Sequence, residues 1–381
     1  MNDEEPIDVE RRHAQRLQQM TTAAELRTPA HEHKSFNQYR KERYDALQSF
    51  VASRRKIYLD TKFWVWLREP AASPNPAATS ALLKELQKGV AEGRLCCPVS
   101  YPIFLETAKI FPLTRRKQHA ATAEALCAGV ALRNPFDVFE LETLDFFIRN
   151  SPPLRNLPLR RDTVWCPVGH MIGEKYPFHA MLEGRAQDVA HKFMLDAMWE
   201  ITLSDLVMHD IPRPPTDTAQ RINVERTIYP RGDKSFQQLL REELHGALEA
   251  LVPHIMSAMR DLASVFGIAA NSGDLTLEAF RPVINLIREA VIQRLDRAAI
   301  PSLRVRSALH AALRLDDERP FRENDLPDID HSAVAVSYCD AFLTERSFGD
   351  LLQRPFIKDV SLSQCAIACD PEEALAVLRS E

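Results

Sequence analysis

Glycine is scarce in this sequence, with 11 among 381 residues, while Leu, Ala, Glu and Arg are abundant. This balance favours helices over a β-sandwich or a β-barrel. No Gly-rich phosphate-binding loop can be found, as the low glycine count already suggests. Hydrophobic residues nevertheless make up 45% of the chain, so it can bury a sizeable core.

Cysteine is also infrequent: there are seven, an odd number, and neither Cys96-Cys97 nor the Cys365/Cys369 pair has the spacing of a zinc site. The segment Met1–Arg12 is acidic and polar, unlike an apolar signal peptide. No run of 18 consecutive apolar residues occurs, so no membrane span is expected. Reduced thiols in a cytoplasmic protein are the simplest interpretation.

An excess of positive charge is lacking too, because the formal net charge is −5. A protein that held nucleic acid by bulk electrostatics would usually be basic. Any contact with nucleic acid must therefore depend on a local basic patch or on metal ions.

The order of the expected elements divides the chain into four parts. Strands and helices alternate at 54–179 and again at 319–381, which is typical of an α/β domain with a parallel sheet. Residues 1–53 form an arm and a helix, and 180–318 read as an all-helical insertion that could bind a partner protein or a second copy of the chain. Strands are expected at 56–60, 95–99, 138–139, 341–344 and 364–368, and helices at 36–53, 61–67, 82–90, 102–110, 117–132, 142–148, 187–208, 236–266, 277–295, 303–315, 328–339, 348–352 and from 371.

Four acids are placed where they could meet. Asp60 ends the first strand and Glu345 follows the strand at 341–344. Asp328 opens the helix leading into that strand, and Glu106 lies on the helix after the second strand. Functional groups of a parallel sheet collect beyond the carboxyl ends of its strands. Four carboxylates there repel one another unless a cation binds or some stay protonated, and oxygen ligands suit Mg²⁺ or Mn²⁺.

These fragments together resemble the PIN domain, a family of metal-dependent nucleases. Leu59-Asp60-Thr61 matches the end of that family's first strand, and Glu106 matches the acid on the helix after its second strand. A further helix in the family begins with the pattern Asp-x-x-His-x-Ala-x-Ala, which is matched by Asp328, His331, Ala333 and Ala335. Thr344 is followed directly by Glu345, where the family more often has an Asp one residue later. The resemblance covers about 55–150 and 320–380 and implies a PIN-like three-layer fold with a central parallel sheet.

Other acids are reserves or structural. Asp325 and Asp330 could share metal binding. Asp340 starts its strand, over ~10 Å from the rim at ~3.3 Å per residue, and is expected to be structural. Glu142 is expected at the surface, and His331 is expected to pack or hydrogen-bond. Phe63, Trp64 and Trp66 are expected in the core, although one of them could stack on a base.

The resemblance implies a metal-dependent endoribonuclease that cuts single-stranded RNA to leave 5′-phosphate and 3′-hydroxyl ends, with Asp60, Glu106, Asp328 and Glu345 at the metal. Two alternatives stay open: a degraded PIN-like scaffold that binds nucleic acid or protein, and a DNA-directed nuclease using the same acids. Each acid also has a structural interpretation: Asp60 could cap a helix, Glu106 could be a solvated helical acid, and Asp328 could be an acid favoured in the first turn of a helix. Candidate phosphate contacts are Arg55, Lys62 and Arg346, and further Arg54, Arg115, Arg116, Arg160 and Arg161.

Overall fold

The structure is a computed structural model that describes residues 34–154, 156–157, 161–174, 184–208, 217–265, 277–293, 300–316, 318–361 and 364–380. Most of the expected N-terminal arm, residues 1–33, lies outside this description, as do Arg160 and the side chain of Arg161. Within the described residues, no helix combines the length and the apolar character needed to cross a membrane.

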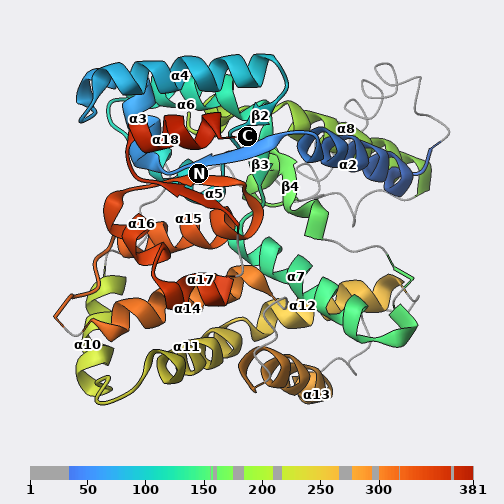
Figure 1. Cartoon of the computed structure of the whole chain (residues 1–381). Coiled ribbons are helices and arrows are strands. Elements are labelled where there is room, and N and C mark those ends of the chain that lie inside the picture. Colours follow the sequence, from blue (N-terminus) through green and yellow to red (C-terminus); the bar gives the residue numbers. More distant parts are fainter. Residues whose placement is uncertain are drawn as a thin grey trace, which may run out of the picture.

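A four-stranded parallel sheet forms the centre of the α/β part (Figure 1). Its strands lie in the order β2 (Leu95–Cys96), β1 (Arg55–Leu59), β5 (Ala341–Leu343) and β6 (Ala366–Ala368). Leu59 pairs with Leu343, so β1 and β5 end at the same edge. The last three residues of β1 are fully buried, as expected for a central strand between helical layers. The expected α/β class with a parallel sheet is therefore confirmed.

A second, antiparallel pair joins β3 (Val130–Leu132) to β4 (Trp165–Pro167), and Val99 bridges to Ala131 of β3. The helix expected at 117–132 ends early, as α6 (Leu113–Cys127), because Ala128 and Gly129 adopt left-handed backbone conformations. The strand expected at 138–139 is wrong. Those residues lie inside α7 (Pro135–Asn150), where the Asn134 side chain caps the helix and Pro135 occupies its first turn.

Helices cover both faces of the sheet. In Figure 1, α4 (Pro76–Ala91), α6 and α18 (Pro371–Arg379) lie above it, and α15 (Asp325–Tyr338) and α16 (Arg346–Leu352) lie below it. Short helices follow β1 and β2: α3 (Thr61–Arg68) begins two residues after β1, and α5 (Tyr101–Ala108) begins after a short link from β2. The aromatic residues Phe63, Trp64 and Trp66 are buried, so their expected place in the core is confirmed.

The helical segments differ from expectation mainly in where they break. A Thr202–Asp205 capping box starts a new helix after α8 (Gly184–Glu200), and Leu251 separates α11 (Phe236–Ala250) from α12 (Val252–Val265). The helix α14 (Pro301–Leu315) packs between α11 and α15, so it joins the helical block to the α/β part (Figure 1). The remaining elements are α2 (Phe36–Ala52), α9 (Leu203–Leu206), α10 (Thr218–Ile228), α13 (Leu277–Arg288), α17 (Pro355–Ser361), a π-helical turn at Glu289–Gln293 and 3-10 turns at Pro70–Ala72, Pro152–Leu154, Arg161–Val164 and Val168–Ile172.

Glu142 is buried, which corrects its expected surface position. Its carboxylate accepts hydrogen bonds from the backbone N–H of Ser302 (3.1 Å), from the Ser302 hydroxyl (2.7 Å) and from the hydroxyl of Tyr338. A carboxylate at the N-terminal end of α14 is stabilised by the unpaired N–H groups of that first turn. Glu142 therefore connects α7 to α14 and α15, a structural role.

Candidate active site

Asp60 stands where β1 passes into α3, with 4% of its surface exposed. One carboxylate oxygen accepts a hydrogen bond from the backbone N–H of Phe63 (3.1 Å), and the other accepts one from the backbone N–H of Glu345 (2.9 Å). Burial raises the pKa of Asp60 against the opposing effect of these hydrogen bonds. Asp60 is therefore a helix cap and at the same time a link between the ends of β1 and β5.

Glu106 reaches the same edge from α5. Its Oε2 atom accepts a hydrogen bond from the Thr61 hydroxyl and lies 3.1 Å from Nε2 of His331. Burial alone would raise the pKa of Glu106, but the contacts with His331 and Thr61 hold it below its ordinary value. Thr61 follows Asp60 directly in the sequence. Its hydrogen bond therefore holds the Glu106 carboxylate near Asp60 and not in bulk solvent.

His331 is 1% exposed and connects Glu106 to the core. Its Nδ1 atom lies 2.7 Å from the Tyr58 hydroxyl, which shares a 2.5 Å hydrogen bond with the hydroxyl of Ser100. Burial would lower the pKa of His331, yet Glu106, Asp60 and Asp328 together raise it. The expected hydrogen-bonding role of His331 is confirmed: it contacts both Glu106 and Tyr58, and the nearby carboxylates favour its protonated form.

Asp328 lies in the first turn of α15 and differs from its neighbours in having no hydrogen bond or ion pair from its carboxylate to the described part of the chain. Burial raises its pKa to about 8, and the negative charges of Glu345, Asp60 and Glu106 add to this effect. The other three carboxylates are therefore near enough to Asp328 for their charges to affect its protonation.

Glu345 is the residue before α16, and 37% of its side chain is exposed, against 23% for Glu106. Its carboxylate accepts a 2.5 Å hydrogen bond from the Ser347 hydroxyl and lies 3.8 Å from the Lys62 ammonium group. The backbone of Glu345 is tied to Asp60, but its side chain stays at the rim. Glu345 is therefore accessible to a ligand from solution.

The three reserve acids are each paired with a base. Asp325 forms a bidentate ion pair with Arg319 (2.6 and 3.1 Å), and Asp330 pairs with Arg306. Asp340 accepts hydrogen bonds from the backbone N–H (2.7 Å) and the ammonium group (2.9 Å) of Lys56, at the opposite end of β5. The structural role expected of Asp340 is thereby confirmed.

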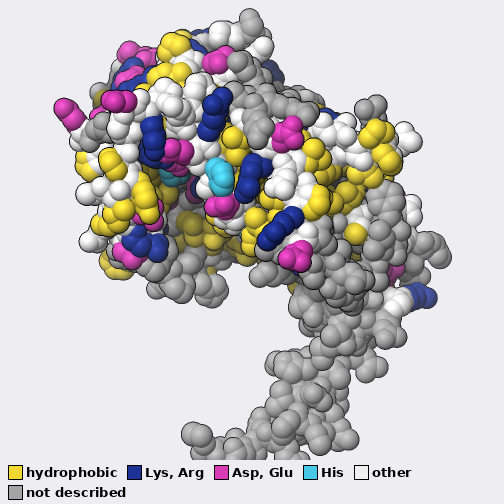
Figure 2. Space-filling model, turned by 90° about the horizontal axis from the view of Figure 1, so that it is seen from below, with side chains coloured by type: hydrophobic (Ala, Val, Ile, Leu, Met, Phe, Trp, Pro, Cys, Tyr) yellow, Lys and Arg dark blue, Asp and Glu magenta, His cyan; other side chains and the backbone are white. Residues whose placement is uncertain are grey.

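The predicted phosphate contacts are scattered. Arg55 donates to the Val377 carbonyl (2.9 Å) at the start of β1, away from the acids, and Arg346 pairs with Asp370 (2.7 Å) and Glu373 (2.8 Å). Lys62 alone of the three lies beside a site acid. On the face shown in Figure 2, Lys and Arg side chains stand among Asp and Glu side chains, with hydrophobic ones between them.

Sequence reasoning missed Lys109, whose positive charge lowers the pKa of Glu106. Its spacing of three residues from Glu106 is a signal that could have found it, since residues three apart on a helix are neighbours. It also missed the Tyr58–Ser100 pair, which meets only in the folded sheet. Lys109 therefore joins Lys62 as a positive charge near the acids.

The chemistry of the four acids suits a hard divalent cation, because their side chains offer only oxygen ligands and Asp328 is surrounded by negative charge. As the side chains stand in the described residues, no three His, Cys, Asp or Glu groups are arranged so that they could hold a metal ion. The reason is visible in the contacts: Glu106 is turned toward Thr61 and His331, and both oxygens of Asp60 face backbone N–H groups.

Comparison of the chain with known protein families, with curated proteins and with solved structures gives no match. The function therefore has to be argued from the site itself.

Proposed function

We propose that this protein is a divalent-metal-dependent endoribonuclease with a PIN-like fold. The observation that carries the proposal is the convergence of Asp60, Glu106, Asp328 and Glu345, which come from opposite parts of the sequence, at the carboxyl edge of one parallel sheet. Such a concentration of buried and half-buried carboxylates is costly unless a cation or bound protons offset it. Within the described residues His331 offsets part of this charge from inside the site, and Lys62 and Lys109 add positive charge nearby.

In this proposal Asp60, Glu106 and Asp328 hold Mg²⁺ or Mn²⁺, and Glu345 completes the set from the rim. The bound cation supplies activation of a water molecule and stabilisation of the leaving oxygen during hydrolysis of a phosphodiester. The water oxygen bonds to phosphorus, the bond from phosphorus to the 3′ oxygen breaks, and 5′-phosphate and 3′-hydroxyl ends result. His331 positions Glu106 through their hydrogen bond, while Lys62 and Lys109 supply positive charge for the phosphate.

The test uses the full chain with Mn²⁺ and end-labelled single-stranded RNA. Asp328→Asn is the informative variant, because its carboxylate makes no hydrogen bond or ion pair within the described residues that folding would lose. We expect cleavage to fall at least about 100-fold. Asp340→Asn is the matched control, since it makes the same change at the other end of β5 and should retain activity. Equal cleavage by wild type and Asp328→Asn would reject the proposal.

A second candidate is a degraded PIN-like scaffold that binds nucleic acid or protein without cutting. The engagement of Glu106 by Thr61 and His331 favours it, since that acid then has a structural partner instead of a cation. Isothermal titration with Mn²⁺ separates the two. The nuclease requires binding that Asp328→Asn weakens, whereas the scaffold predicts no binding by either protein. Cleavage of single-stranded DNA in parallel tests the DNA-directed alternative.

A further inference from the structure

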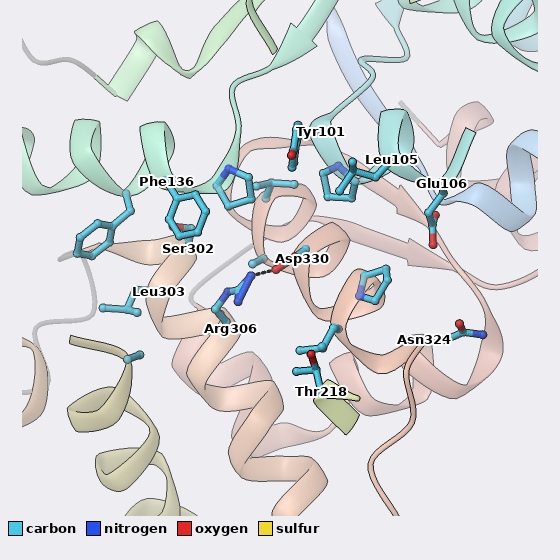
Figure 3. A pocket seen from close by; sticks show the side chains of 18 of the residues that line it. Tyr101, Leu105, Glu106, Phe136, Thr218, Ser302, Leu303, Arg306, Asn324 and Asp330 are labelled. Carbon is cyan, nitrogen blue, oxygen red and sulfur yellow. Dashed lines mark ion pairs between the residues drawn. The ribbon is translucent and has the colours of Figure 1, made fainter. Parts of the chain in front are cut away.

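A cavity of about 980 Å³ opens beside the acids, between α5, α7, α11, α14 and α15. Thr61 and Glu106 belong both to its wall and to the carboxylate site, so the cavity borders that site. Figure 3 shows Glu106 at one end of this space and Phe136 at the other, with Arg306 and Asp330 between them. A cavity of this size falls in the range that holds small ligands or parts of larger ones.

Most of the wall is aromatic or aliphatic. Phe136 is its most exposed ring: 53% of the residue is accessible, and one face stacks on His254 with a centroid distance of 4.6 Å and an interplanar angle of 10°. A phenyl ring that is supported on one face and accessible to solvent is a suitable platform for another flat ring. The other large apolar wall residues include Tyr101, Phe139, Leu303 and Leu326.

A few polar groups interrupt this apolar wall. Arg306 of α14 and Asp330 of α15 form an ion pair in it, and Asn324 lies where α15 begins (Figure 3). Together they present N–H donors and carbonyl or carboxylate acceptors toward a space whose wall is mostly apolar but also includes Thr218, Ser302 and Glu323. Unpaired bases need this combination, because they offer a flat apolar face and an edge of donors and acceptors.

We propose that this cavity receives the unpaired bases of the RNA strand next to the phosphate held at the carboxylate site, with Phe136 as a stacking platform and the Arg306–Asp330 pair at the base edges. This inference rests on the proposed nuclease function and adds to it a binding site for bases that have left a helix stack. Duplex RNA keeps its bases paired and stacked, so they cannot enter the cavity. The helical block thereby contributes to substrate binding through α14 and α11.

The experiment measures binding and cleavage separately. The Asp328→Asn protein is used to measure binding of a fluorescein-labelled single-stranded oligoribonucleotide of mixed sequence by fluorescence anisotropy. The wild-type protein, which keeps Asp328, is used to measure KM and kcat of cleavage. Two cavity variants are added to each: Phe136→Ala, which removes an exposed ring at little cost in packing, and Ala250→Trp, which fills the cavity from its exposed rim. Tyr229→Ala is the control, because Tyr229 is 70% exposed and lies outside the cavity wall.

We expect Phe136→Ala and Ala250→Trp each to weaken oligonucleotide binding and raise KM about tenfold, as for the loss of one base stack. The control should match its parent, and duplex RNA of the same sequence should bind poorly to all. If RNA is cleaved but both cavity variants bind and cut like their parents, the base-binding inference fails while the nuclease stands. If no RNA is cleaved, the nuclease fails. If, in addition, the cavity variants bind the oligonucleotide as tightly as the Asp328→Asn protein, the base-binding inference fails as well.

Discussion

The carboxylate of Asp60 accepts a 2.9 Å hydrogen bond from the backbone N–H of Glu345, a residue 285 positions away in the sequence. The same carboxylate caps α3 through Phe63. A single side chain thus orders the ends of two adjacent parallel strands and the starts of the helices that follow them. This double role allows stability and activity to be separated by substitution.

Asp60→Asn should abolish cleavage and cost less stability than Asp60→Ala, since asparagine keeps one oxygen for one of the two N–H groups that Asp60 binds. Asp60→Ala should lower the free energy of unfolding by about 2–4 kcal/mol, because it removes the cap and leaves the buried N–H of Glu345 without its partner. Urea unfolding followed by circular dichroism checks both values. Similar stabilities for the Ala and Asn variants would contradict the structural role.

Adding Mn²⁺ should stabilise the protein, because a ligand that binds only the folded chain shifts the folding equilibrium. At about 100 times its dissociation constant the gain is about 2.7 kcal/mol, visible as a rise in melting temperature that EDTA reverses. Asp328→Asn should lose most of this gain, and Asp340→Asn should keep it. A rise of equal size in all three proteins would place the cation elsewhere.

His331→Phe should destabilise the protein by about 1–3 kcal/mol, since the buried Tyr58 hydroxyl and the Glu106 carboxylate each lose one hydrogen-bond partner and keep only Ser100 and Thr61. It should also lower kcat more than it changes KM, because Glu106 loses its orientation. Tyr58→Phe is the comparison: it shortens the hydrogen-bonded chain but keeps the contact between His331 and Glu106. If Tyr58→Phe reduced kcat as strongly as His331→Phe, the positioning role would be wrong.

Acid should destabilise the protein through His119, which is fully buried and whose ring nitrogens have no hydrogen bond within the described residues. Burial lowers its pKa from 6.5 to about 4. Between these values the unfolded chain binds a proton that the folded chain does not. The free energy of unfolding therefore falls as the pH drops from 6.5 toward 4. His119→Leu should remove this part of the pH dependence.

The measurement is a series of urea unfolding curves between pH 4 and 7 for the two proteins. We expect the stability of His119→Leu to exceed that of wild type increasingly toward pH 4. Parallel curves would mean that His119 is accessible to protons in the folded state.

The sequence alone predicted the parts that depend on neighbouring residues. The strand next to Asp60 and the helix near Asp328 have local hydrophobic patterns, and both occur, although the helix begins three residues before Asp328, at Asp325. The parallel sheet followed from the alternation of such elements. Helix ends were predicted less well, because a left-handed Ala128 or a capping box at Thr202 changes the path of the chain without changing the hydrophobic period.

Only the tertiary structure decided which distant groups meet. The pairing of β1 with β5 brings Glu345 to Asp60, and the packing of α5 against α15 turns Glu106 toward His331. Packing of α14 buries Glu142 and bounds the cavity beside the acids. These outcomes depend on contacts between segments hundreds of residues apart, whose free energies are set by complementary shape and burial and leave no periodic trace in the sequence.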